Sequence, residues 1–176
     1  ALSSLITEEC QGEILKTYES TFQNCLAELY RKKLGLRKSK SDDTHLIQSL
    51  LDIMESEKLD YTNTFRNLST AVIKDHTAEL SSDLAKAWIK SYQKRQEIEI
   101  SSSEKKIKLL NESNPKFILR NYMAQEAIEA AEESDFSVIE KLIEVITNPF
   151  DELDEYQHYA EKSPEWAKDL EISCSS

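Results

Sequence analysis

Few polar residues in this chain have a spacing suited to catalysis or metal binding. Glu155 and His158 are separated by three positions, which would place both side chains on one face of a helix. Di-iron helical bundles use this Glu-x-x-His pair twice, together with two further glutamates, whereas here it occurs once. We therefore interpret the segment as an exposed acidic helix and expect no metal, with a metal-dependent helical enzyme as an alternative.

The other common catalytic patterns are also missing. Gly12 and Gly35 are the only glycines, so the chain cannot form a Walker-type phosphate loop, which needs two glycines five positions apart. The three histidines share no spacing that indicates a cluster. Cys25 occupies an apolar helical position, which favours an inert core thiol over a nucleophile paired with a histidine. The sequence therefore predicts no catalytic and no cofactor-binding residue.

The cysteines point to a reducing compartment. Cys10, Cys25 and Cys174 are odd in number, widely spaced and contain no Cys-x-x-Cys pair. Cys174 differs from the others because it is the third residue from the end and lies among serines, with no apolar face to pack into. An exposed terminal thiol is available for oxidation or exchange, although an incidental tail cysteine is the simpler interpretation.

Composition excludes several classes of partner. The chain has 22 Lys and Arg against 33 Asp and Glu, and its net charge of -11 repels phosphate backbones, so we expect no nucleic acid. No apolar run approaches the ~20 residues that span a bilayer, so we expect no membrane partner. The basic run 37–41 is interpreted as a solvated loop.

Because the chain starts at Ala1 and not Met, we expect it to be a piece of a longer protein.

Two glycines and three prolines in 176 residues favour an all-α fold, which we expect to be one antiparallel assembly of about seven or eight helices. Residues 114–132 carry the strongest helix signal, with Pro115 in the first turn, and other elements are expected to pack around them. Arg120 and Asn121 interrupt the apolar face of this helix and require partners. Further helices are expected over residues 7–35, 42–54, 60–68, part of 69–80, 82–95, 104–110 and 135–147, with a single turn at 163–166.

Several segments resemble a known family. Residues 114–125 and 127–132 are similar to the C-terminal signature of the selenoprotein O family, and Asn114, Pro115, Arg120, Asn121 and Gln125 carry this motif. Shorter pieces agree in order and spacing: residues 33–36, 60–66, 148–150, 164–166 and 173–176. The resemblance covers about residues 18–176.

The resemblance implies a protein adenylyltransferase. Family members have a protein-kinase-like core that binds ATP and Mg²⁺ and transfers AMP to Ser, Thr and Tyr hydroxyls of protein substrates. That core precedes the region matched here, so no catalytic residue can be assigned to this chain. Some members have selenocysteine at the third position from the C-terminus, which is Cys174 here. The resemblance thus suggests a redox-active thiol that pairs with a cysteine of the core to restrain activity.

We therefore expect residues 1–176 to be a single helical C-terminal region that supports the kinase-like core of the same polypeptide and is inactive alone. Residues 167–176 are expected to be a flexible tail that carries Cys174. Arg120 and Asn121 are interpreted as structural residues, and the compartment as the bacterial cytoplasm or alternatively the mitochondrion. The alternative is a free-standing helical protein-interaction module, which would have no exposed apolar face, whereas a region cut from its core would expose one.

Overall fold

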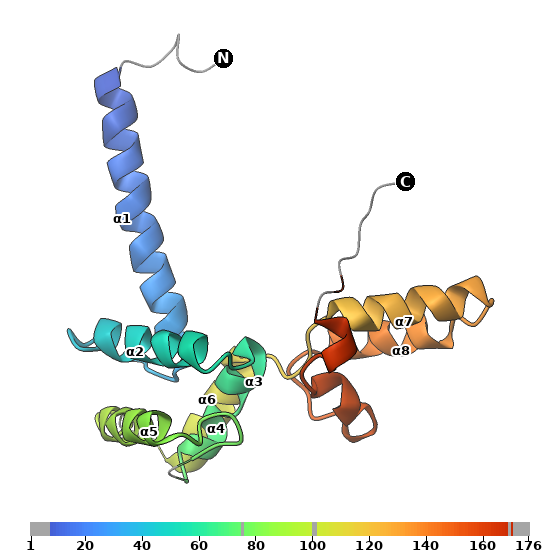
Figure 1. The fold of residues 1–176 in the computed structure, drawn as a ribbon. Helices are drawn as coiled ribbons and strands as arrows, with labels where there is room; N and C mark the ends of the chain where they lie inside the picture. The colour runs from blue at the N-terminus through green and yellow to red at the C-terminus, as the bar shows by residue number, and fades with distance from the viewer. Residues whose placement is uncertain (1–7, 75, 100–101, 169, 171–176) are drawn as a thin grey trace.

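The computed structural model describes residues 8–74, 76–99, 102–168 and 170, and every regular element in these ranges is helical. The α-helices are α1 (Glu8–Lys33), α2 (Asp43–Ser56), α3 (Tyr61–Arg66), α4 (Leu68–Ala71), α5 (Asp83–Gln96), α6 (Ser103–Ser113), α7 (Asn121–Glu132) and α8 (Ser137–Thr147), followed by the 3-10 helices η1 (Asp154–Ala160) and η2 (Glu165–Ala167) (Figure 1). This confirms the predicted all-α fold. None of the described helices is both long and apolar enough to cross a membrane.

Helix α1 ends at Lys33, close to the predicted stop near Gly35. Gly35 has a φ of +66°, and its N–H donates to the carbonyl of Lys32 at 2.9 Å, while the N–H of Leu36 donates to the carbonyl of Arg31 at 2.8 Å. These two hydrogen bonds form a Schellman motif, which satisfies the last carbonyls of a helix and needs a left-handed residue at this position. The motif reverses the chain and buries Leu34 and Leu36.

Helices α2 and α5 form the main contact of the first buried cluster, and α3, α4 and α6 complete it (Figure 1). Trp88 packs parallel to Tyr92 and donates from Nε1 to the carbonyl of Leu46 at 2.9 Å. The hydroxyl of Tyr92 donates to the carbonyl of Leu34 at 3.0 Å, so the end of α1 is fixed to α5. This first cluster contains Leu34, Leu36, Leu46, Ile47, Leu50, Ile53, Met54, Phe65, Leu68, Ala71, Leu80, Ala85, Trp88, Ile89, Tyr92 and Leu110.

A buried network of ion pairs and hydrogen bonds connects α5 to the start of α2 and to the loop between α1 and α2. Arg95 contacts Asp43 from Nε at 2.6 Å and Glu99 from Nη1 at 3.0 Å. All three side chains are buried, and Glu99 also accepts the backbone N–H of Lys38 at 3.1 Å. A buried charge is stable only with such partners, so this network holds residues 38–43 against α5.

Helices α7 and α8 form an antiparallel hairpin around a second buried cluster. Ser134 takes a φ of +66° in the turn, where the N–H of Asp135 donates to the carbonyl of Ala130 at 2.9 Å. Trp166 of η2 meets the edge of Tyr122 with ring centroids 6.2 Å apart. This second cluster contains Phe117, Tyr122, Met123, Ala127, Leu142, Val145, Tyr159 and Ala167.

The predicted start of the central helix at Pro115 is wrong, because α7 begins at Asn121. Asn114 is extended, with φ -125° and ψ 110°, as expected for a residue before proline. The N–H groups of Lys116 and Phe117 both donate to the carbonyl of Pro149, at 2.7 and 3.1 Å, instead of to a helical partner. Residues 114–120 are therefore an extended link, and Phe117 anchors it in the second cluster.

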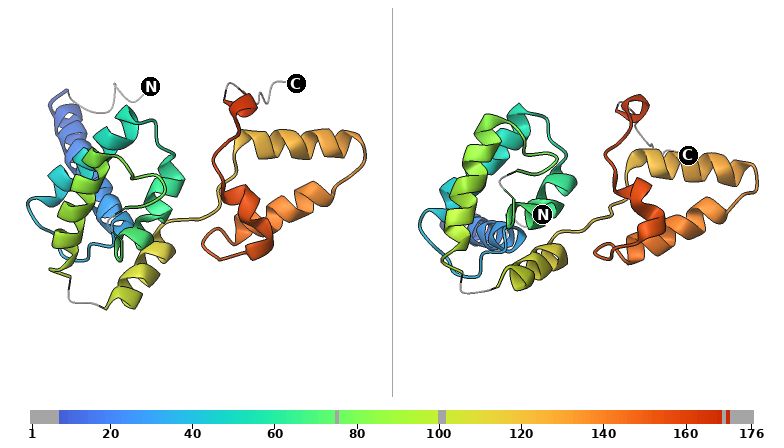
Figure 2. Two further views of the ribbon diagram at one scale, coloured as in Figure 1. Left: turned by 60° about the horizontal axis from the view of Figure 1, so that its bottom comes forward. Right: turned by 90° about the horizontal axis from the view of Figure 1, so that it is seen from below.

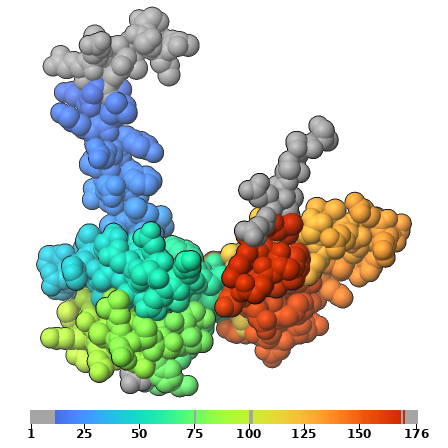
Figure 3. All heavy atoms as spheres, in the orientation of Figure 1, coloured from blue at the N-terminus to red at the C-terminus, as the bar shows by residue number. Residues whose placement is uncertain are grey.

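The extended link connects two bodies, one formed by α1–α6 and one by α7, α8, η1 and η2 (Figure 2). The N-terminal part of α1 projects away from the first body, without another element beside it (Figures 1 and 3). The buried residues accordingly form two clusters, and the stretch that starts at Asn114 joins them.

Candidate functional site

Asn114 lies at the centre of the junction between the two bodies and is completely buried. Its Nδ2 donates to the carbonyl of Lys33 at 2.8 Å and to the carbonyl of Leu110 at 3.0 Å, and its Oδ1 accepts from Lys33 Nζ at 3.3 Å. The amide therefore joins the end of α1 to the end of α6. Desolvation lowers the pKa of Lys33, whose ammonium also lies over the Tyr61 and Phe65 rings.

Arg66 contacts both bodies from the end of α3. Its Nη1 donates to the carbonyls of Asn111 and Asn114 at 2.7 and 2.8 Å, and its Nη2 donates to the carbonyl of Phe150 at 3.2 Å and to Glu152 at 2.6 Å. The side chain is 9% exposed. The sequence did not single out Arg66 as a site residue, because its partners are 45 to 86 positions away along the chain.

An ion pair between Arg120 and Asp60 also connects the two bodies. Arg120 Nη1 lies 2.6 Å from Asp60 Oδ2, and Nη2 lies 3.1 Å from Oδ1, which is the bidentate geometry favoured by guanidinium and carboxylate. Asp60 also caps α3 by accepting the N–H of Asn63 at 2.9 Å. Partial burial raises the pKa of Asp60. Hydrogen bonds from Arg120 and Asn63 lower it by a larger amount, so the pKa lies below the usual 3.8.

The other motif residues make local contacts. Asn121 Nδ2 donates to the carbonyl of Leu170 at 3.0 Å, and Gln125 Nε2 donates to Glu129 at 2.9 Å within α7. Within the range 167–176, which the sequence predicts to be a flexible tail, Ala167 is buried and Leu170 packs against the second cluster. Cys174 lies outside the described residues.

The described part of the chain shows no assembled active site. It contains no group of three or more His, Cys, Asp and Glu side chains that could hold a metal ion. Glu155 and His158 lie in η1, where the His158 ring packs 4.0 Å from the Tyr159 ring. Of the motif residues, Asn114 and Arg120 lie at the junction between the two bodies, whereas Asn121 and Gln125 make contacts within the second body.

The most unusual surface is the apolar face of α1, which we define as Ile14, Leu15, Tyr18, Phe22 and Leu29. Each of these side chains is about half exposed or more, with Tyr18 at 68% and Phe22 at 49%. Cys25 follows this face and is also exposed, so the prediction of a buried core thiol is wrong. The helical spacing was correct, but no described element covers this part of α1.

Comparison with known proteins agrees with the resemblance seen in the sequence. The family model described as protein adenylyltransferase SelO matches residues 1–147. The match starts earlier than the expected position near residue 18, and it ends before residues 148–150, 164–166 and 173–176. It includes α1 to α8 and therefore both sides of the junction.

Individual relatives match the whole chain. The protein nucleotidyltransferase YdiU of Photobacterium profundum is 39% identical over 194 aligned positions, and the match covers 38% of that protein. The YdiU proteins of Aliivibrio salmonicida and Pseudomonas fluorescens are each 38% identical to the chain, which covers 37% of their lengths. The helical chain is thus similar over its whole length to proteins named as protein nucleotidyltransferases. It belongs to the SelO family and spans 37–38% of the length of these relatives.

Proposed function

We propose that this chain is the C-terminal helical region of a protein adenylyltransferase, whose kinase-like catalytic part transfers AMP from ATP to Ser, Thr and Tyr hydroxyls of other proteins. Family membership supports the activity. The role of the present chain is to support the catalytic part of the same polypeptide, which binds ATP and Mg²⁺. The chain alone is inactive in this proposal, because the resemblance assigns the ATP- and Mg²⁺-binding residues to the core that precedes the matched region.

The observation that carries the supporting role is the exposed apolar face of α1. A run of exposed apolar side chains along one face of a helix is typical of an interface. More than half of the length of the YdiU relatives lies outside the part that matches this chain. That remaining polypeptide is the proposed occupant of the face. Burying a fully exposed Leu, Phe or Ile side chain contributes roughly 1.5–3 kcal/mol, and covering these partly exposed side chains contributes about half of that each, so several together stabilise a permanent contact.

The alternative, a free-standing helical interaction module, predicts no such face and is less well supported. The bacterial relatives favour the bacterial cytoplasm as the compartment, with the mitochondrion as the alternative for a eukaryotic source.

The resemblance also supports a redox role for Cys174, through a disulfide with a cysteine of the catalytic part. Peptide mapping of the unreduced parent protein tests this role, and a Cys174 that stays a free thiol under mild oxidation contradicts it.

The supporting role is tested in the full-length parent protein with the double substitution Tyr18→Ser and Phe22→Ser. We expect a lower melting temperature and a loss of AMP incorporation from labelled ATP, because the contact between α1 and the catalytic part is broken. Ile73→Ser is the matched control, since Ile73 is also 68% exposed but lies after α4, away from α1. Full activity and stability of the double variant would refute the supporting role.

A separate measurement tests the inactivity of the chain. The isolated chain is incubated with labelled ATP and Mg²⁺, alone and with a protein substrate of the parent. We expect no AMP on either protein. AMP-transfer activity that copurifies with this chain contradicts the proposal. The expected result is AMP transfer by the full-length parent only.

A further inference from the structure

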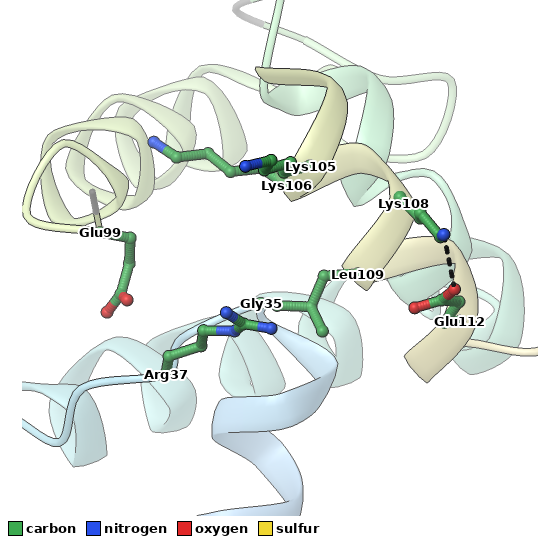
Figure 4. A pocket seen from close by; sticks show the side chains of 8 residues that line it. All are labelled: Gly35, Arg37, Glu99, Lys105, Lys106, Lys108, Leu109 and Glu112. Atoms are coloured by element: carbon green, nitrogen blue, oxygen red, sulfur yellow. Dashed lines mark ion pairs between the residues drawn. The ribbon is translucent and has the colours of Figure 1, made fainter. Parts of the chain in front are cut away.

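We propose that a basic groove between the end of α1 and α6 binds an acidic peptide segment of a partner protein. The groove is lined by Arg31, Lys32, Arg37, Lys105, Lys106 and Lys108, with Leu109 between them (Figure 4 shows its α6 half). This inference depends on the charge and shape of the described residues and is independent of the adenylyltransferase activity.

Positive charge is concentrated in the two segments that line this groove. Residues 31–40 and 105–108 hold nine of the 22 Lys and Arg residues and contain no Asp or Glu, although the whole chain carries a net charge of -11. The sequence suggests a solvated loop for residues 37–41, and the second basic segment, 105–108, lies far away along the chain. The fold brings the two segments to opposite sides of one hollow. Such a local reversal of sign attracts an anionic partner.

The carboxylates in the groove do not neutralise this charge. Glu99 is buried and already paired with Arg95 at 3.0 Å. Glu112 and Glu28 pair with Lys108 and Lys32 at 3.7 and 3.8 Å, and both pairs are exposed and therefore weak. Within the described part of the chain, the side chains of Arg37 and Lys105 form no hydrogen bond or ion pair with another residue. They are available to a ligand.

The shape of the groove favours an extended ligand over a single small anion. Two hollows of about 290 and 400 Å³ adjoin each other and share Arg37 and Leu109. In Figure 4 the cationic groups are spread along the hollow and do not converge on one point. A peptide can place successive carboxylates near separate cations, while its backbone passes over Leu109. Arg37 can bind one of these carboxylates in the bidentate manner.

The groove also stays accessible when the apolar face of α1 is covered. Arg31 follows Phe22 by about two and a half helical turns, so the two side chains point to opposite sides of α1. A polypeptide that packs on Phe22 therefore leaves the side of Arg31 open. Nucleic acid is a less suitable ligand, because the rest of the strongly acidic chain would repel a long phosphate backbone.

The binding test measures fluorescence anisotropy of a labelled acidic peptide, built from alternating Glu and Gly, added to the 176-residue chain. We expect saturable binding that weakens with added salt. The double variant Arg37→Glu and Lys105→Glu should weaken binding at least about tenfold. Lys90→Glu and Lys94→Glu on exposed positions of α5 make the same change in net charge outside the groove, and should stay within about twofold of the original.

Each alternative result has a definite meaning. Equal loss in both double variants, or no saturable binding at low salt, would overturn the proposal, provided circular dichroism shows unchanged helix content. Tighter binding of a single-stranded oligonucleotide than of the peptide would assign the groove to nucleic acid. Sedimentation experiments could instead show self-association that only the Arg37 and Lys105 substitutions abolish. This result would assign the groove to a second copy of the chain and would also overturn the proposal.

Discussion

Arg66 Nη1 lies 2.8 Å from the carbonyl oxygen of Asn114, and this hydrogen bond joins α3 to the point where the chain leaves α6. The same Asn114 holds the end of α1 through the carbonyl of Lys33, and the same guanidinium reaches Phe150 after α8. Two side chains therefore connect three elements of the first body with the second. Asn114, one of the motif residues, thus has a structural role at the junction in this chain.

Replacing Arg66 by Met should destabilise the chain by roughly 3 kcal/mol. The substitution keeps most of the side-chain volume but leaves the carbonyls of Asn111 and Asn114 without a donor, and each unsatisfied buried carbonyl costs about 1–3 kcal/mol. Urea unfolding followed by circular dichroism measures the change. Lys108→Met, which removes an exposed ion pair, is the control and should change stability by under about 0.5 kcal/mol. Equal effects of the two substitutions would contradict the assigned role of Arg66.

The two glycines should respond to alanine with opposite signs. Gly35→Ala should destabilise by about 1–2 kcal/mol, because Gly35 is left-handed and its new Cβ would lie 3.2 Å from Leu110. Gly12→Ala should stabilise by about 0.5–1 kcal/mol, since Gly12 is inside α1 with no atom within 4 Å of a Cβ. Thermal unfolding of both variants tests this. A stabilising Gly35→Ala would show that the Schellman motif does not end α1.

Stability should fall on acidification through the ion pair of Asp60 with Arg120. The pKa of Asp60 is lower in the folded chain than its usual 3.8, so its contribution is fully present above that value and is lost as the pH falls through the folded pKa. Glu152, whose pKa is raised by burial but lowered more by Lys116 and Arg66, acts in the same direction. We expect the free energy of unfolding to decrease between about pH 5 and pH 2.

The variant Asp60→Asn isolates the charge in this effect. Asparagine is as good a helix cap as aspartate, so the α3 cap is kept while the ion pair is lost. The variant should be less stable than the original at pH 7 and should lose less stability on acidification. A double-mutant cycle with Arg120→Gln should show coupling at pH 7 that decreases as the pH falls through the folded pKa of Asp60. An unchanged slope in Asp60→Asn would contradict the assignment.

Sequence reasoning succeeded where local signals decide the structure. Gly35 after a basic last turn predicted the end of α1, and Asp60 and Ser82 predicted the starts of α3 and α5, where both side chains accept a backbone N–H. Such caps depend on neighbours within a few residues, so the sequence contains the whole signal.

The junction could not be predicted because its contacts are between distant segments. Pro115 fits both a first helical turn and an extended link, and the choice is made by the carbonyl of Pro149, which accepts two N–H groups from residues 116 and 117. Arg66 and the basic groove likewise depend on segments that the fold brings together. The exposed position of Cys25 has a different origin, since apolar periodicity identifies a face but not what covers it.

Cys25 provides a direct test of what covers α1. The thiol follows Phe22 by nearly one helical turn and precedes Leu29 by about one turn, so it lies along the apolar face. In the isolated chain, in a background with Cys10→Ser and Cys174→Ser, Cys25 should react with a thiol reagent about as fast as in urea, because it is exposed. In the full-length parent the same thiol should be protected by the polypeptide that packs on α1.

The matched control for the thiol test is Ser91→Cys on α5. It is made in the same Cys10→Ser and Cys174→Ser background, with Cys25→Ser added. Residue 91 is exposed and lies outside the apolar face of α1, so its reactivity should be the same in the isolated chain and in the parent. Protection confined to Cys25 would locate the contact on α1, whereas protection at both positions would indicate general burial in the parent. Rapid reaction of Cys25 in the parent would show that the face is open there too, and α1 would then have to meet a separate partner.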